Sequence, residues 1–183
     1  MRLFVAVPLP ADAHQAAVLE LRFLRELGWP VRWVRDDGLH ITLKFFGEVA
    51  PDRLDTIAEM LGYTVERMAP MTLAITGGGA FPHASKPRVL RLDVTPDPAL
   101  ELLQDRIERG GESIGFPPEG RPFHPHITLG RVREGHRLPH DAMARLEGIA
   151  PHAPFLADQV VLYESELGSG GPTYRSRAEF PLR

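Results

Sequence analysis

The tetrapeptide His-Ile-Thr-Leu occurs once in each half of the chain, at residues 40–43 and at residues 126–129. A β-strand sends alternate side chains to opposite faces, so His40 shares a face with Thr42, and His126 shares one with Thr128. Histidine is the side chain whose ordinary pKa suits proton transfer near neutral pH, and a threonine hydroxyl can donate a hydrogen bond. The repeat therefore predicts one site with a histidine acid, a histidine base and two positioning hydroxyls. The sequence leaves open which histidine is the acid.

The elements around the two motifs recur in one order: strand, helix, motif strand, helix and strand. In the first half we expect strand 3–7, helix 12–27, motif strand 40–46, helix 52–68 and strand 71–76. In the second half we expect strand 88–94, helix 97–115, a motif strand from residue 126, helix 141–146 and strand 160–163. Such an order indicates an internal duplication. We expect an α+β fold with two lobes of antiparallel sheet, related by a pseudo-twofold axis, with helices outside and a central cleft between facing motif strands.

Composition is that of an ordinary globular protein, with 43% hydrophobic and 25% charged residues among 183, and we expect a single domain spanning residues 1–183. Because the chain has no cysteine, disulfides, thiol catalysis and thiolate metal sites are excluded. Glycine-rich stretches at residues 77–79 and 168–172 predict turns. No apolar run approaches the length of a membrane span, so we expect a cytoplasmic protein without membrane association.

The net charge of −3 argues against a protein that coats nucleic acid by bulk electrostatics. Positive charge is nevertheless dense near the motifs. Arg32, Arg35 and Lys44 flank the first copy, and Arg121, Arg131 and Arg133 flank the second.

Two other readings of the histidines remain. His124 and His126, with His40 and an acid such as Asp93, could form a zinc or manganese hydrolase site. The protein could instead be a non-catalytic module in which the histidines hold a phosphate.

Beyond the motifs, the likeness to a known family covers nearly the whole chain. It rests on the opening at residues 3–9, the run 31–49 around His40, the run 121–129 with Arg131, and the tail at residues 170–174. These stretches resemble the 2H phosphoesterases, named for paired His-x-Thr-x motifs. Within that group they resemble the RNA 2′,3′-cyclic phosphodiesterases of the LigT and ThpR type, historically called 2′-5′ RNA ligases.

The resemblance implies hydrolysis of a 2′,3′-cyclic phosphate to a 2′-phosphate, at a site between two lobes that needs neither metal nor cofactor. By this resemblance His40 protonates the leaving 3′ oxygen and His126 activates water. The implied partners are nucleotides and RNA ends that carry a cyclic phosphate, tRNA fragments among them. The non-catalytic alternative is then a module that binds such RNA ends without turnover. Reversible 2′-5′ ligation is a second implied activity, and we expect a monomer.

Further substrate-binding residues come from strand alternation and from the family pattern. Alternation adds Lys44 and Phe46 to the face of His40, as a phosphate charge and a base-stacking ring, with core packing the alternative for Phe46. Arg131 matches a family arginine that contacts the phosphate. Strict alternation puts Arg131 on the wrong face, although Gly130 could permit a twist. His124 stands where relatives more often have arginine, which leaves its role open.

Overall fold

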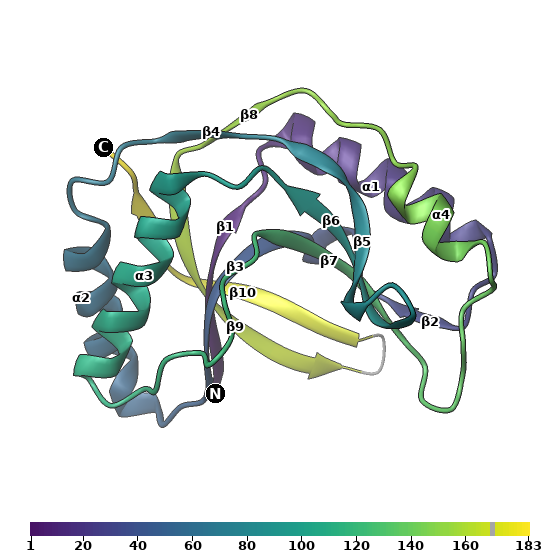
Figure 1. The fold of residues 1–183 in the computed structure, drawn as a ribbon. Coiled ribbons are helices and arrows are strands. Elements are labelled where there is room, and N and C mark those ends of the chain that lie inside the picture. Colours follow the sequence, from purple (N-terminus) through teal and green to yellow (C-terminus); the bar gives the residue numbers. More distant parts are fainter. Residues whose placement is uncertain (169–170) are drawn as a thin grey trace.

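The computed structural model describes residues 1–168 and 171–183, and Figure 1 shows their fold. The helices are α1 (Ala11–Glu26), α2 (Leu54–Val65), α3 (Pro98–Ser113) and α4 (Ala142–Glu147). The strands are β1 (Arg2–Pro8), β2 (Val31–Trp33), β3 (His40–Glu48), β4 (Met71–Leu73), β5 (Ile75–His83), β6 (Lys86–Val94), β7 (His126–Val132), β8 (Phe155–Ala157), β9 (Gln159–Gly168) and β10 (Gly171–Pro181). Because every strand pairing is antiparallel, the expected α+β class is confirmed.

The two motif strands, β3 and β7, are hydrogen-bonded neighbours inside one continuous sheet. Its order is β10-β9-β1-β3-β7-β6-β5, with β2 also pairing with β7, and β4 and β8 form a separate two-stranded sheet. Ile41 of β3 pairs with Ile127 of β7. The motifs therefore lie side by side, whereas the sequence predicted them on strands that face each other.

The order of elements recurs along the chain, but the two halves are interleaved in space. Strand, helix, motif strand and helix occur as β1-α1-β3-α2, with β4 and β5 after them. They recur as β6-α3-β7-α4, with β8 and β9 after them. A late strand of each half pairs with the first strand of the other, because β9 lies beside β1 and β5 lies beside β6, while the final strand, β10, pairs with β9. Each side of the sheet is thus built from both halves.

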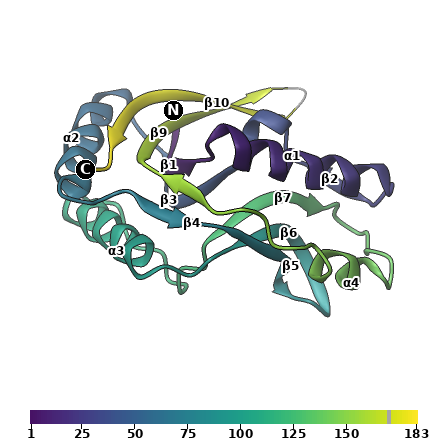
Figure 2. The ribbon, with the colours of Figure 1, turned by 90° about the horizontal axis from the view of Figure 1, so that it is seen from above.

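The apolar residues of both motifs are buried beneath the helices. Ile41, Leu43, Ile127 and Leu129 are each at most 3% exposed, which confirms that they point into the core. Figure 2 shows α2 and α3 together at one end of the molecule and α1 and α4 toward the other. Asp97 caps α3 by accepting hydrogen bonds from the backbone of Ala99 and Leu100, and Pro98 follows it.

The glycines at residues 77–79 lie within strand β5, so the turn predicted there is wrong. A Cβ on Gly78 would lie 2.6 Å from the carbonyl oxygen of Leu146. The glycine therefore allows α4 to approach the strand closely. Residues 169 and 170 of the second predicted turn lie outside the described residues.

Candidate functional site

The motif histidines and threonines come together on one face of the sheet. With Ile41 opposite Ile127, the antiparallel register places His40 across from Thr128 and Thr42 across from His126. Opposite residues of an antiparallel pair point to the same face. All four side chains are partly exposed there, and we call this surface the His–Thr face.

Each motif strand carries a bulge directly after its threonine. Along β3, Ala6 of β1 pairs with Thr42 and Val5 pairs with Lys44, so Leu43 is skipped. Along β7, Arg91 of β6 pairs with Thr128 and Leu90 pairs with Gly130, so Leu129 is skipped. An extra residue in one strand reverses the alternation of side chains beyond it.

The bulges determine which later residues share the His–Thr face. They bring Phe45 in the first copy and Arg131 in the second to this face, at corresponding positions, and both side chains are exposed. Arg131 thus lies on the same face as His126, and the bulge supplies the change of facing that strict alternation does not allow. Phe45 was not singled out from the sequence, because alternation alone assigns it to the core.

Lys44 and Phe46 do not lie on this face, so the substrate-binding placement of both is wrong, whereas the core-packing alternative for Phe46 is confirmed. The bulge turns both inward, so that Lys44 is 2% exposed and Phe46 is 7% exposed. The Lys44 ammonium donates to Glu108 Oε2 at 2.5 Å and to the carbonyl oxygen of Pro117 at 2.9 Å. Phe46 packs edge-on against Phe116, with 5.1 Å between ring centroids. Lys44 is an internal ion-pair partner and Phe46 is a core residue.

His40 is surrounded by aromatic rings. It stacks on Phe4 at 4.8 Å between centroids and meets Tyr174 edge-on at 5.2 Å. This burial lowers the pKa of His40 to about 4, against a hydrogen bond to the Gly38 backbone that favours the charged form, and the nearby His126 lowers the pKa further. His40 is therefore neutral at pH 7 in the free protein.

His126 is held in one tautomer by the backbone. Its Nδ1 donates to the carbonyl oxygen of His124 at 2.7 Å, which leaves Nε2 free to accept a proton. Burial is the largest cause of its lowered pKa, and the charges of Arg91 and His124 act in the same direction. Phe81 packs edge-on against the ring at 4.9 Å.

His124 belongs to a polar network with Asp93 and Arg91, on the strand next to His126. Asp93 Oδ1 accepts from Arg91 Nε at 2.7 Å and lies 3.2 Å from His124 Nε2. The Arg91 guanidinium also covers the Phe81 ring, 4.0 Å from its centroid. Within the described residues, no three His, Asp or Glu side chains are grouped closely enough to hold a metal ion.

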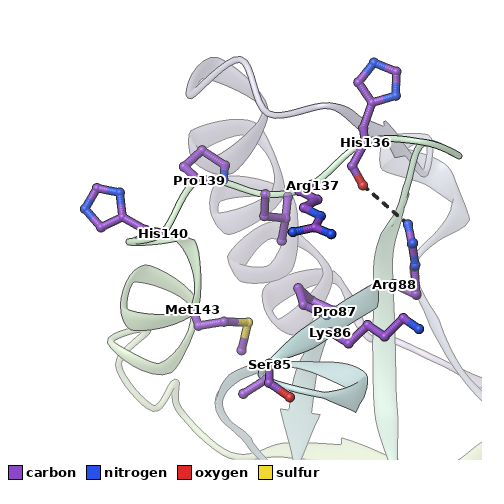
Figure 3. Close-up of a pocket in the computed structure, with 11 residues that line it drawn as sticks. Ser85, Lys86, Pro87, Arg88, His136, Arg137, Pro139, His140 and Met143 are labelled. Carbon is purple, nitrogen blue, oxygen red and sulfur yellow. Dashed lines mark hydrogen bonds between the residues drawn. The ribbon is translucent and has the colours of Figure 1, made fainter.

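A pocket of about 640 Å³ at the β5–β6 turn lies apart from these residues (Figure 3). The 11 residues that line this pocket come from the β5–β6 turn, the start of β6 and residues 136–143, and none of them is among those placed on the His–Thr face. Arg88 contributes to the pocket and donates weakly to the carbonyl oxygen of His136 at 3.4 Å. The pocket is therefore distinct from the His–Thr face.

Comparison with known proteins assigns a family to this fold and this pair of motifs. Residues 10–169 match the 2′-5′ RNA ligase superfamily, and the chain belongs to it.

No described helix is long and apolar enough to cross a membrane.

Similar proteins carry one recurring name. A Geobacillus stearothermophilus protein named RNA 2′,3′-cyclic phosphodiesterase is 34% identical over 182 residues, which is 98% of this chain but only 56% of that relative. A protein of the same name from Methanothermobacter thermautotrophicus is 31% identical over 100% of this chain and 99% of its own length.

Solved structures share the fold over the full chain. A Thermus thermophilus structure superposes with a TM-score of 0.80 at 30% identity, covering 100% of this chain and 98% of the other. Escherichia coli LigT complexed with 3′-AMP superposes with a TM-score of 0.78 at 27% identity, covering 99% and 97%.

Proposed function

We propose that this protein hydrolyses the 2′,3′-cyclic phosphate of nucleotides and RNA ends to a 2′-phosphate, without a metal ion or cofactor. One observation carries the proposal: the paired motifs place His40 and His126 on neighbouring strands of one face, each across from the other motif's threonine. The relatives named RNA 2′,3′-cyclic phosphodiesterase support the substrate, and the LigT complex with 3′-AMP supports a nucleotide ligand.

The reaction needs one proton removed and one delivered. His126 Nε2 takes a proton from water, whose oxygen attacks phosphorus while the bond to the 3′ oxygen breaks. His40 gives its proton to the leaving 3′ oxygen, so the phosphate stays on the 2′ oxygen. His40 must be protonated for this step, and the bound phosphate anion favours its charged form.

The neighbouring side chains hold the substrate for this step. The Thr42 and Thr128 hydroxyls donate to the non-bridging oxygens, and the Arg131 guanidinium adds a positive charge beside them. The exposed ring of Phe45 offers a surface on which the terminal base can stack, the role first expected of Phe46.

The remaining expectations form part of the same proposal. The recurring element order and the motif pairing through Ile41 and Ile127 support two halves related by a pseudo-twofold axis. We propose that residues 1–183 act as one domain and as a cytoplasmic monomer. tRNA fragments with cyclic ends are candidate substrates, and reversible 2′-5′ ligation is a candidate second reaction.

Product analysis in EDTA tests the proposal. An RNA oligomer with a 2′,3′-cyclic end should be converted to the 2′-phosphate, and His126→Ala should slow this conversion by on the order of 100-fold or more. His136→Ala is a matched control, because His136 also donates from Nδ1 to a carbonyl two residues earlier, that of Glu134, at 2.9 Å. Activity that disappears in EDTA and returns with zinc or manganese would support the metal reading. Binding without any turnover would support the RNA-end module.

A further inference from the structure

Three arginines extend the His–Thr face outward from the two motifs. Arg32 of β2 pairs directly with Arg131 of β7, and the backbone N–H of Arg133 donates to the carbonyl oxygen of Pro30, which continues the same register. The residues between them, Val31 and Val132, are buried at 2% and 8% exposure. Alternation therefore turns Arg32, Arg131 and Arg133 to the face that carries His126 and Thr128.

The charges of Arg32 and Arg133 are left uncompensated by the acids nearby. Both arginines line a shallow pocket of about 700 Å³ beside β2, which Arg25, Arg35, Asp36 and Asp37 also line. Asp36 is bound by Arg22 at 2.7 Å and by Arg25 at 3.2 Å, and Asp37 is bound by Arg35 at 3.0 Å. Across the described part of the chain, neither Arg32 nor Arg133 has a side-chain ion pair.

We propose that Arg32 and Arg133 bind backbone phosphates of an RNA chain upstream of its cyclic end. A 2′,3′-cyclic phosphate occupies the 3′ end of an RNA, so the rest of the chain must leave the site in the 5′ direction. At about 3.3 Å per strand residue, Arg133 lies roughly 15 Å from Thr128, beyond the phosphate that the motifs hold. The guanidinium fork suits phosphate oxygens. This inference rests on the proposed function and names the residues that contact the RNA upstream of its cyclic end.

The test compares two substrates in one double variant, Arg32→Gln/Arg133→Gln. The substrates are an RNA oligomer with a 2′,3′-cyclic end and the cyclic mononucleotide with the same terminal base. We expect KM for the oligomer to rise about tenfold with kcat nearly unchanged, and both constants for the mononucleotide to stay as in the wild type. The slope of log kcat/KM against log salt for the oligomer should become shallower by about 1.4, roughly 0.7 for each lost phosphate contact.

A second double variant controls for the loss of positive charge alone. Lys86→Gln/Arg137→Gln removes the same charge from the pocket of Figure 3 and should leave both substrates unaffected. Equal losses on oligomer and mononucleotide, no loss on either, or the same oligomer loss in the control would each overturn the inference. Failure of the proposed function gives a different result, since the wild-type protein would then not turn over the mononucleotide at all.

Discussion

His40 and His126 belong to identical tetrapeptides, yet their surroundings suit them to different roles. His40 stacks on Phe4 and is ringed by aromatic groups that disfavour its charged form. His126 has its Nδ1 fixed on the His124 carbonyl oxygen, which leaves Nε2 as the unprotonated ring nitrogen of the neutral imidazole. His126 therefore suits the proposed role of base in the free protein, whereas His40, the proposed acid, would gain its proton when an anion binds beside it.

The lowered pKa values of both histidines predict how the rate depends on pH. The profile of kcat/KM reports the free protein, in which both pKa values lie below 6.5, so its bell should have an optimum below pH 6.5. Bound phosphate raises the pKa of a neighbouring imidazole, so the optimum of kcat should lie at higher pH. Initial rates on the cyclic mononucleotide across a pH series provide both profiles. Coincident optima would contradict the proposed proton uptake by His40.

At the scale of elements, the two bulges explain what the sequence could predict and what it could not. Period-two alternation correctly assigned His40, Thr42 and Ile41 because the strand is regular up to that point. It failed at Lys44 and Phe46, because the bulge at Leu43 leaves no mark in the sequence that distinguishes a bulged strand from a regular one. The short strand β8 was not predicted either, since its three residues have too little periodicity to be recognised and depend on pairing with β4.

The Lys44–Glu108 pair joins the first motif strand to α3 and, through Pro117, to the segment before the second motif. Lys44→Met leaves the Glu108 carboxylate buried without its cation, which should cost about 3–5 kcal/mol in the free energy of unfolding. Lys44→Met/Glu108→Leu removes both charges and should recover most of that loss. Urea denaturation measures each value.

A surface ion pair on the same helix is the matched control for this prediction. Arg109 binds Asp105 at 3.0 Å and its side chain is 77% exposed. Arg109→Met should cost about 1 kcal/mol or less, because exposed pairs contribute little. A loss for Lys44→Met no larger than this would show that the buried pair does not stabilise β3.

At the scale of the whole molecule, the interleaved halves predict one cooperative unit. β9, from the second half, pairs with β1 of the first, and β5, from the first half, pairs with β6 of the second. Neither half can complete its own side of the sheet without the other.

Thermal and urea unfolding should therefore show one transition by two different probes. Trp29 and Trp33, whose rings lie 6.4 Å apart, report the surroundings of β2 by fluorescence, and far-ultraviolet circular dichroism reports the whole chain. We expect the two midpoints to coincide, as in two-state unfolding. An early fluorescence transition followed by a separate loss of ellipticity would show that the halves unfold independently.

The central claim is that His40 and His126 act together in one proton-transfer step, and a double-mutant cycle tests it most directly. kcat/KM on the cyclic mononucleotide is measured for the wild-type protein, His40→Ala, His126→Ala and the double variant. Each single substitution should reduce the rate by on the order of 100-fold or more. The double variant should lose far less than the product of the two single losses, because neither histidine completes the reaction without the other. Losses that multiply, or a single variant that keeps wild-type turnover, would contradict the paired mechanism.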